Sequence, residues 1–348
     1  MIDFIKKLLD KIKLFVLYWT RIVFVKNHFK CSLFNKLRSN IFGGYLADQY
    51  VLYDFRHNDK KEYLSEFDWY RSRYINKPFD FLMNNKIACN EILQQYVRVP
   101  EIYAFSREKL IADFDGRQLD FNDLCSIIAE HHPVFIKPYG KGKGNGVFRL
   151  DYRDNMYYAD NKALTADEMT AFLKKQKNWM MCEAMSQHEY SSAIYDQTVN
   201  TIRLITLREP ATGSYKIFFA VQRIGTHETI PVDNGSRGGL ISKIDLETGT
   251  LSEARCLHSL EVHKVHPDSK APIEGVRIPG WDNIKTKMLA LANKLPYMYF
   301  VAWDILITPE DFCIIEANTS SGVNIIQLWG GQRNGELGDF YRYHKVIK

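Results

Sequence analysis

YFVAWDILITPEDFCIIEAN, residues 299–318, is the stretch of the sequence that decides the fold. Two runs rich in β-branched and aromatic residues flank Thr308-Pro309-Glu310-Asp311, and this pattern predicts a β-hairpin. With a three-residue loop, Asp304 lies opposite Glu316 on the paired strands. Asn318, two residues further on, then projects from the same face as Glu316.

Three polar side chains, Asp304, Glu316 and Asn318, therefore share one face of a strongly apolar hairpin. A carboxylate in a half-buried strand is costly unless a cation compensates its charge. Oxygen ligands of this kind suit Mg²⁺, which commonly also holds phosphate. The alternative is the polar outer face of an ordinary hairpin; for the whole triad we favour the metal site.

The composition predicts a soluble globular protein with a large core. The chain has 348 residues, 46% of them hydrophobic and 25% charged. That length suggests roughly two or three structural units. Six scattered cysteines, with no CxxC pair, indicate free thiols in a reducing cytosol.

Basic residues are concentrated at the N-terminus. Residues 1–40 hold nine Lys or Arg and two Asp, a net charge of +7, so the remainder sums to −2. Apolar residues recur every three or four positions in 2–25, which predicts an amphipathic helix too interrupted to cross a membrane. Two interpretations stay open: the helix lies on an anionic membrane surface, or it packs on the protein's own body.

Helix and strand signals alternate along the rest of the chain, a pattern typical of α/β lobes. Residues 41–80 resemble helical packing material. Further helices are predicted at 84–96, 120–130, 165–175 and 281–294, and strands at 100–105, 134–137, 146–150, 179–183, 200–207, 215–223 and 240–244. Residues 258–280 are expected to form an irregular surface loop whose histidines, among them His266, are solvated.

A glycine-rich segment follows the strand that ends in Lys137. Its glycines are Gly140, Gly142, Gly144 and Gly146. Glycine amides can approach phosphate closely, although neither the Walker A nor the protein-kinase spacing is met. A flexible hairpin tip is the alternative.

Two arginines, Arg203 and Arg223, lie within apolar strands. An unpaired guanidinium is unfavourable there, and arginine is well shaped to clamp phosphate oxygens. A structural ion pair is an equal alternative for each. Glu183 ends the buried strand WMMCE, and Asn234 begins a second glycine-rich segment, NGSRGG.

These motifs, in this order, resemble the ATP-grasp superfamily, most closely its sugar-transfer-associated branch. The resemblance covers about residues 80–330 and rests on an ordered set. The set is Lys86, FIKPYGKGKGNGV (135–147), CEAM (182–185), NTIRLITL (200–207), AVQRIG (220–225), NGSRGG (234–239), VAWDI (301–305) and IIEAN (314–318).

The resemblance implies a role for each candidate residue. Lys86 and Lys137 hold the nucleotide, with Lys137 at the α- and β-phosphates, and Gly140 to Gly146 close over the phosphates. Glu183 sits beside the adenine and Glu189 binds the ribose. Residues around the γ-phosphate and the acyl phosphate are Arg203, Arg223 and Asn234; residues that bind Mg²⁺ are Asp304, Glu316 and Asn318.

The implied protein is an α+β ATP-grasp fold in which two α/β lobes clasp ATP. We expect a helical N-terminal region (1–80), a first lobe (81–184) and a second lobe (185–348). Residues 1–80 do not resemble the small α/β domain that usually precedes the lobes, which leaves the acceptor site open.

The implied activity is an ATP-dependent carboxylate–amine ligase that forms an amide through an acyl phosphate, leaving ADP and phosphate. The substrates would be an acid and an amine, such as an amino acid and a sugar or lipid-linked sugar in cell-surface polysaccharide synthesis. We expect a cytoplasmic enzyme, with or without contact between residues 1–25 and the inner face of the membrane, and no nucleic-acid partner. The alternatives are a phosphotransferase on the same fold and a catalytically silent, membrane-associated binding protein.

Overall fold

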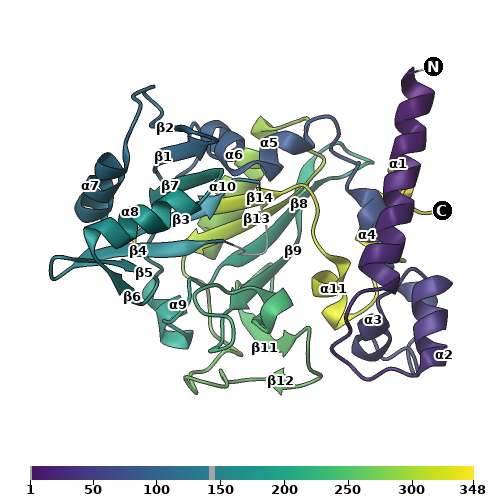
Figure 1. Cartoon of the computed structure of the whole chain (residues 1–348). Helices are drawn as coiled ribbons and strands as arrows, with labels where there is room; N and C mark the ends of the chain where they lie inside the picture. The colour runs from purple at the N-terminus through teal and green to yellow at the C-terminus, as the bar shows by residue number, and fades with distance from the viewer. Residues whose placement is uncertain (1, 141–145) are drawn as a thin grey trace. The chain divides into compact units, whose positions relative to one another are not determined.

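The predicted hairpin is present in the computed structural model. Its strands are β13 (Phe300–Ile307) and β14 (Phe312–Asn318), which are neighbours in one sheet (Figure 1). The backbone N–H of Thr308 donates to the carbonyl of Asp311 at 2.9 Å. This bond closes the turn around Pro309 and Glu310, and the three-residue loop stays a prediction. The predicted facing of the acidic side chains stays a prediction.

The structure describes residues 2–140 and 146–348, and the chain forms two units. The first comprises Met1–Asp80, Ser192–Trp303 and Asn318–Lys348, and the second comprises Phe81–Ser191 and Asp304–Ala317. The N-terminal helical region thus belongs to the same unit as the strands that follow residue 192. The three expected domains stay a prediction drawn from sequence.

The second unit is built on a seven-stranded antiparallel sheet of order β2-β1-β7-β3-β4-β5-β6. Its strands are β1 (Ile102–Arg107), β2 (Leu110–Ala112), β3 (Val134–Pro138), β4 (Phe148–Arg153), β5 (Met156–Ala159), β6 (Lys162–Leu164) and β7 (Trp179–Glu183). Three of its helices are α5 (Asp80–Asn84), α6 (Lys86–Leu93) and α9 (Glu189–Ile194). The first residue of α5 and the last residues of α9 belong to the first unit.

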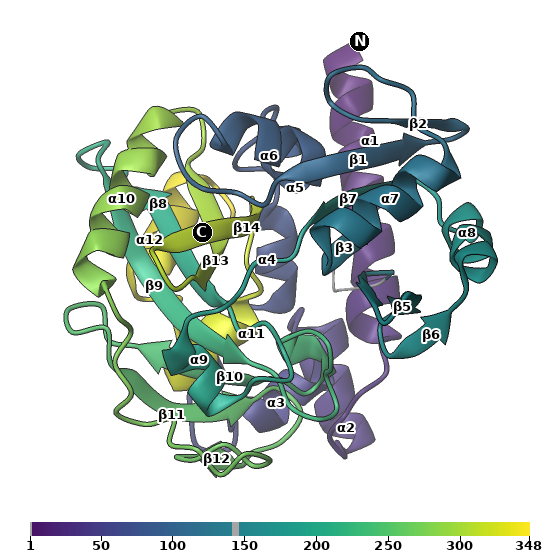
Figure 2. The same ribbon diagram turned by 90° about the vertical axis from the view of Figure 1, so that its left-hand side faces the viewer.

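Helices α7 (Phe121–His131) and α8 (Ala166–Lys175) pack together on this sheet (Figures 1 and 2). Leu124 and Ile128 of α7 and Met169 of α8 enter one buried cluster with strand residues such as Val134. Both helices begin with a capping box, at Asp120 and at Thr165. A capping box satisfies two backbone N–H groups at the helix start, so local sequence sets these boundaries.

The first unit carries the sheet β12-β11-β10-β9-β8, to which β13 adds. The strands are β8 (Ile202–Arg208), β9 (Tyr215–Ile224), β10 (Leu240–Ile244), β11 (Leu251–Cys256) and β12 (Val262–His263). Helix α10 (Trp281–Lys294) lies against β8 and β9 (Figures 1 and 2). The short helices η4 (Gly235–Arg237), α11 (Val323–Ile326), η5 (Gln327–Trp329) and α12 (Glu336–Tyr343) complete the unit after residue 192.

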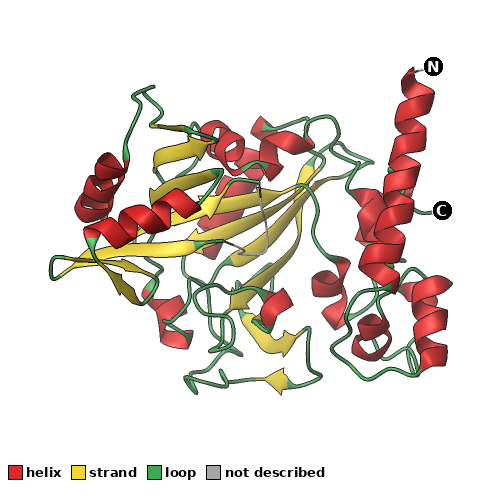
Figure 3. Cartoon of the chain, viewed as in Figure 1, coloured by secondary structure: helices red, strands yellow, loops and turns green. Residues whose placement is uncertain are grey.

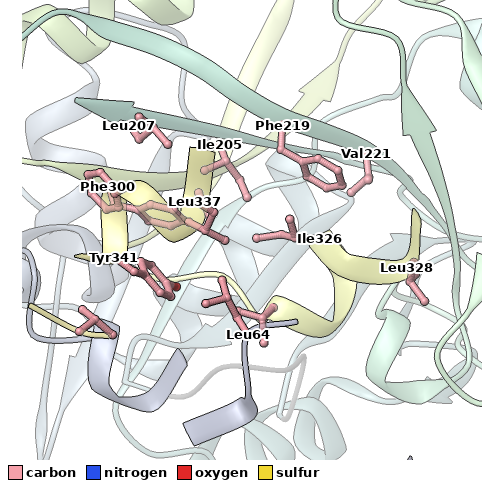
Figure 4. Close-up of a cluster of buried hydrophobic side chains, with 14 of the residues drawn as sticks. Leu64, Ile205, Leu207, Phe219, Val221, Phe300, Ile326, Leu328, Leu337 and Tyr341 are labelled. Atoms are coloured by element: carbon pink, nitrogen blue, oxygen red, sulfur yellow. The ribbon is translucent and has the colours of Figure 1, made fainter. Parts of the chain in front are cut away.

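A hydrophobic core joins distant segments of the first unit. Leu64 from the N-terminal region, Ile205 and Val221 from the sheet, and Ile326 and Tyr341 from the C-terminal segment belong to one buried cluster (Figure 4). The side-chain carbonyl of Gln327 also accepts from the backbone N–H of Leu64 at 2.7 Å. The N-terminal region is therefore an integral part of this unit.

The N-terminal 80 residues form helices joined by loops (Figure 3). The elements are α1 (Ile2–Tyr18), the π-helix η1 (Trp19–Val23), α2 (Leu33–Lys36), the π-helix η2 (Leu37–Ile41), α3 (Ala47–Leu52), η3 (Lys60–Glu62) and α4 (Glu66–Ser72). No helix within the described residues combines the length and the apolar character needed to cross a membrane.

The 258–280 segment is largely irregular, as expected, but His266 is buried and the prediction of a solvated side chain was wrong. Its Nε2 lies 2.8 Å from the carbonyl oxygen of Gly225, so Nε2 carries the hydrogen. Its Nδ1 accepts from the backbone N–H groups of Asp268 and Ser269, both at 3.2 Å. Burial lowers the pKa of His266 below its ordinary value. The neutral ring thus has a structural function.

Candidate functional site

A narrow cleft in the second unit brings together three of the predicted site residues. Lys86 from the first turn of α6, Lys137 from β3 and Glu316 from β14 all line it. The side-chain oxygen of Asn85 accepts from the backbone N–H groups of Ile87 and Ala88 at 3.1 Å and caps the helix that carries Lys86. The other lining residues are mostly apolar: Met83, Cys89, Asn90, Leu93, Val99, Pro100, Met180, Ile314 and Ile315.

The charges in this cleft are partly paired. Lys86 Nζ lies 3.4 Å from Glu316 Oε2, and the two side chains are 12% and 29% exposed. Lys137 Nζ lies 5.3 Å from the centre of the Phe135 ring. Two ammonium groups and one carboxylate leave the cleft with a positive formal balance. Such a cleft suits an anionic ligand that also has an apolar part.

Cys89, which also lines the cleft, is unsuited to nucleophilic chemistry. Burial raises the pKa of its thiol to about 12, although a backbone hydrogen bond with Ala317 lowers it. The thiolate is the nucleophilic form of cysteine, so Cys89 stays protonated at neutral pH. All six cysteines of the chain are free thiols, as the sequence indicated.

Glu183, at the end of β7, has a charged partner that the sequence did not reveal. Arg98 Nη2 lies 2.7 Å from Oε1 and 2.5 Å from Oε2 of Glu183. The backbone N–H of Glu101 donates to the same carboxylate at 3.2 Å. Arg98 stands 85 positions earlier in a short VRVP segment without periodicity, so no local pattern pointed to it. Glu189 is the exposed first residue of α9.

The glycine-rich segment is described only at its two ends. Gly146 has φ +75° and its position suits glycine, because a Cβ there would lie 3.0 Å from Pro138 Cγ. Gly140 is exposed, with open space around it. Gly142 and Gly144 lie outside the described residues.

The predicted metal ligands are distributed along the hairpin. Asp304 in β13 is buried, with 5% of its surface exposed, and Glu316 and Asn318 occupy alternate positions of β14. Asn318 begins the last segment of the first unit, whereas the two acidic residues belong to the second. Among residues 2–140 and 146–348, no group of three or more His, Cys, Asp or Glu side chains is arranged to hold a metal ion.

Two of the predicted catalytic residues share one face of the sheet in the first unit. Arg203 pairs with Val221 in the β8–β9 ladder, and the N–H of Arg223 donates to the carbonyl of Thr201 at 2.8 Å. Because alternate residues of a strand share a face, Arg203 and Arg223 are diagonal neighbours on adjacent strands. Arg203 Nη1 also approaches Ser321 Oγ at 3.5 Å.

The Arg223 guanidinium is fixed by Asp233, a second residue that the sequence did not single out. Arg223 Nη2 lies 2.9 Å from Asp233 Oδ1, and the two side chains are 15% and 7% exposed. Thr201 joins them: its Oγ1 accepts from Arg223 Nη2 at 2.7 Å and donates to Asp233 Oδ2 at 2.6 Å. This network holds the guanidinium in one orientation.

Asn234, the residue after Asp233, caps the short helix η4. Its side-chain oxygen accepts from the backbone N–H and from the hydroxyl of Ser236, both at 2.9 Å. The carbonyl of Asn234 accepts from the N–H of Arg237 at 2.9 Å. The residue therefore stabilises the turn beside the Arg223 network.

Comparison with known proteins gives one family match. Residues 67–335 match the model of the family described as sugar-transfer associated ATP-grasp. A search of curated proteins found no match.

Several solved structures are similar in fold. They include an ADP complex of N5-carboxyaminoimidazole ribonucleotide synthetase (13% identity, TM-score 0.40, 69% of this chain and 45% of that one). The ATP-grasp ligase PsnB with a minimal precursor has 13% identity and TM-score 0.43, over 78% of this chain and 63% of its own. D-alanyl-alanine synthetase A from Vibrio cholerae has 12% identity and TM-score 0.44, over 77% and 66%. The chain spans less than half the length of the N5-carboxyaminoimidazole ribonucleotide synthetase and less than two thirds of the length of PsnB.

Proposed function

Because the chain belongs to the sugar-transfer-associated ATP-grasp family, we propose that it is an ATP-dependent ligase that joins a carboxylate to an amine. The observation that carries the proposal is the cleft lined by Lys86, Lys137 and Glu316, whose apolar walls and positive formal balance suit a nucleotide. The inertness of Cys89 argues against an enzyme-bound thioester formed there.

The nucleotide contacts in this proposal come from the second unit. Lys137 contacts the α- and β-phosphates, and Lys86 offers a second ammonium group near them. Glu183, oriented by Arg98, accepts a hydrogen bond from the adenine amino group, and Glu189 binds the ribose. The backbone of Gly140 to Gly146 covers the phosphates and excludes water from the reaction.

A Mg²⁺ site formed by Asp304, Glu316 and Asn318 completes the nucleotide complex. The donor set fits this ion, because carboxylate and amide oxygens are its preferred protein ligands. When bound, Mg²⁺ would polarise the phosphate oxygens and offset their charge.

The proposed reaction has two steps. A carboxylate oxygen of the acid attacks the γ-phosphorus of ATP, ADP leaves, and an acyl phosphate forms. The amine nitrogen then attacks the acyl carbon, phosphate leaves with the former carboxylate oxygen, and the nitrogen loses a proton. Arg203 and Arg223 offset the charge that develops on the transferring phosphoryl group. Asn234, the residue after the Arg223 partner Asp233, orients the acyl phosphate in this proposal.

The support for a substrate class is the family description alone. We propose that the amide joins an amino acid or similar acid to a sugar or lipid-linked sugar during cell-surface polysaccharide synthesis. The enzyme would then act in the cytoplasm, where ATP is available.

The test uses hydroxylamine as a substitute for the unknown amine. The protein is incubated with MgATP, hydroxylamine and a panel of amino acids and sugar acids, and both the nucleotide and the hydroxamate are measured. We expect ADP, phosphate and a hydroxamate in equal amounts with the correct acid. AMP with pyrophosphate would contradict the proposal, and a stable phosphorylated product would favour a phosphotransferase.

A matched pair of variants distinguishes this activity from a contaminating ATPase. Glu316→Gln removes a proposed metal ligand, whereas Glu310→Gln changes an exposed carboxylate in the turn of the same hairpin. The proposal requires that the first variant lose the activity and the second keep it. MgATP binding without turnover for any acid would favour a silent binding protein.

A further inference from the structure

The N-terminal region carries an unusual concentration of exposed apolar side chains. Of 21 exposed large hydrophobic side chains among the described residues, 11 lie between residues 5 and 42. We call these the N-terminal apolar surface: Ile5, Leu8, Leu9, Ile12, Phe15, Val16, Phe24, Leu33, Phe34, Leu37 and Phe42. Each is 40% to 83% exposed. A concentration of exposed apolar side chains of this kind is typical of an interaction site.

Helix α1 is attached to the rest of the first unit by the side that carries Asp10 and Tyr18. The Tyr18 hydroxyl lies 2.6 Å from the carbonyl oxygen of Ile41, and its ring meets Phe67 edge-on with centroids 5.0 Å apart. Asp10 Oδ1 lies 3.7 Å from Lys77 Nζ. Asp10, Leu14 and Tyr18 are four residues apart, so they follow one side of the helix. The opposite side, with Leu9, Ile12 and Val16, stays exposed.

Basic and aromatic side chains lie along the borders of this exposed side and in the segment that follows the helix. Lys11, Lys13, Lys26 and Lys30 are exposed and form no ion pair with a described residue. Phe15 and Phe24 both contact Trp19, with ring centroids 6.2 Å and 5.8 Å away. Residues 1–40 have a net charge of +7 from nine basic and two acidic residues.

We propose that the N-terminal apolar surface binds the anionic leaflet of a membrane. An apolar helix face with a Trp–Phe cluster and flanking lysines is the composition that binds at the boundary between headgroups and acyl chains. A second copy of the chain is a poorer occupant, because it would bring a second charge of +7 against the first. The inference does not depend on the proposed ligase activity.

The test is vesicle co-sedimentation of the full chain without nucleotide. Vesicles of phosphatidylcholine alone are compared with vesicles that also contain phosphatidylglycerol, and each mixture is repeated at high salt. We expect binding to the anionic vesicles only and release by salt, since screening weakens the lysine contribution. Each lysine near an anionic surface contributes about 1 kcal/mol, so Lys11→Gln with Lys13→Gln lowers the partition coefficient about 25-fold.

Matched substitutions identify the surface. Leu9→Ser with Ile12→Ser removes two side chains that are each 50% exposed, and we expect about tenfold or greater loss of vesicle binding. The control is Leu260→Ser with Val262→Ser, which are 62% and 53% exposed and lie outside the surface. Because all four side chains are exposed, the melting temperature is expected to stay unchanged.

Three results would overturn the proposal. One is absence of binding to anionic vesicles at low salt. Another is equal loss of binding in the Leu9–Ile12 variant and in the Leu260–Val262 control. The third is a stable dimer, measured by light scattering, that dissociates in the Leu9–Ile12 variant, because a second copy would then cover the surface.

Discussion

Replacing Arg223 by alanine is expected to lower both the stability and the turnover of the protein. The guanidinium forms an ion pair of 2.9 Å with Asp233, and the two side chains are only 15% and 7% exposed. Coulomb's law gives about 6 kcal/mol for this pair at an effective dielectric constant of about 20. Desolvation offsets much of that attraction. Removal of one partner nevertheless costs about 3 to 5 kcal/mol, because the other charge stays buried.

We expect the low end of that range, about 3 kcal/mol, because Asp233 keeps other hydrogen bonds. The N–H and the hydroxyl of Thr201 still donate to its Oδ2 at 2.7 Å and 2.6 Å. Turnover is expected to fall by about 100-fold or more, since the arginine would act where charge develops during phosphoryl transfer.

A second substitution separates the two effects. In Arg223→Ala with Asp233→Asn, the buried carboxylate is gone, so about half of the lost stability is expected to return while turnover stays low. The assays are urea unfolding and steady-state turnover at saturating ATP, with exposed Arg277→Ala as the control. An unfolding free energy equal to wild type in Arg223→Ala, or recovered turnover in the double variant, would refute the reasoning.

Asp304→Asn and Glu316→Gln are each expected to abolish turnover. The unfolding free energy is expected to change by about 1 kcal/mol or less, because relief of repulsion between the carboxylates offsets the lost contacts. Wild-type turnover of Glu316→Gln at saturating Mg²⁺ would disprove the role of Glu316 as a metal ligand. Lys137→Ala is expected to weaken ATP binding measured by calorimetry, since Lys137 contacts phosphates already present in bound ATP, and unchanged affinity would show that the lysine is misassigned. Burial lowers the pKa of His266 in the folded protein. The imidazole therefore binds a proton more readily in the unfolded chain than in the folded protein. The stability that this histidine contributes is present above pH about 6.5 and is lost as the pH falls toward the folded-state pKa. His266→Gln is expected to flatten this acid-side loss in pH-dependent urea unfolding, and an unchanged slope would contradict it.

Much of the fold could be predicted because its signals are local. Helix α10 occupies Trp281–Lys294 as predicted, and α8 occupies Ala166–Lys175 where a helix over 165–175 was predicted. The hairpin and the ATP-grasp fold were also predicted, and the family match over residues 67–335 confirms the resemblance. Period, caps and motif order are all properties of neighbouring residues, so a single sequence contains them.

The remainder depends on contacts between distant residues. Arg98 reaches Glu183 across 85 positions, and His266 is buried against Gly225 across 41. No period or spacing encodes such partners. The helical period of α1 likewise could not say which side faces solvent, because that depends on where Tyr18 and Asp10 attach.

The most direct test of the ligase proposal follows the oxygen atoms of the acid. Once the hydroxylamine assay has identified the acid, it is prepared with ¹⁸O in both carboxylate positions, and the phosphate produced with MgATP and amine is examined by mass spectrometry. Attack of a carboxylate oxygen on the γ-phosphorus predicts one ¹⁸O atom in each phosphate released. Unlabelled phosphate, or ¹⁸O recovered in AMP, would contradict the acyl-phosphate route.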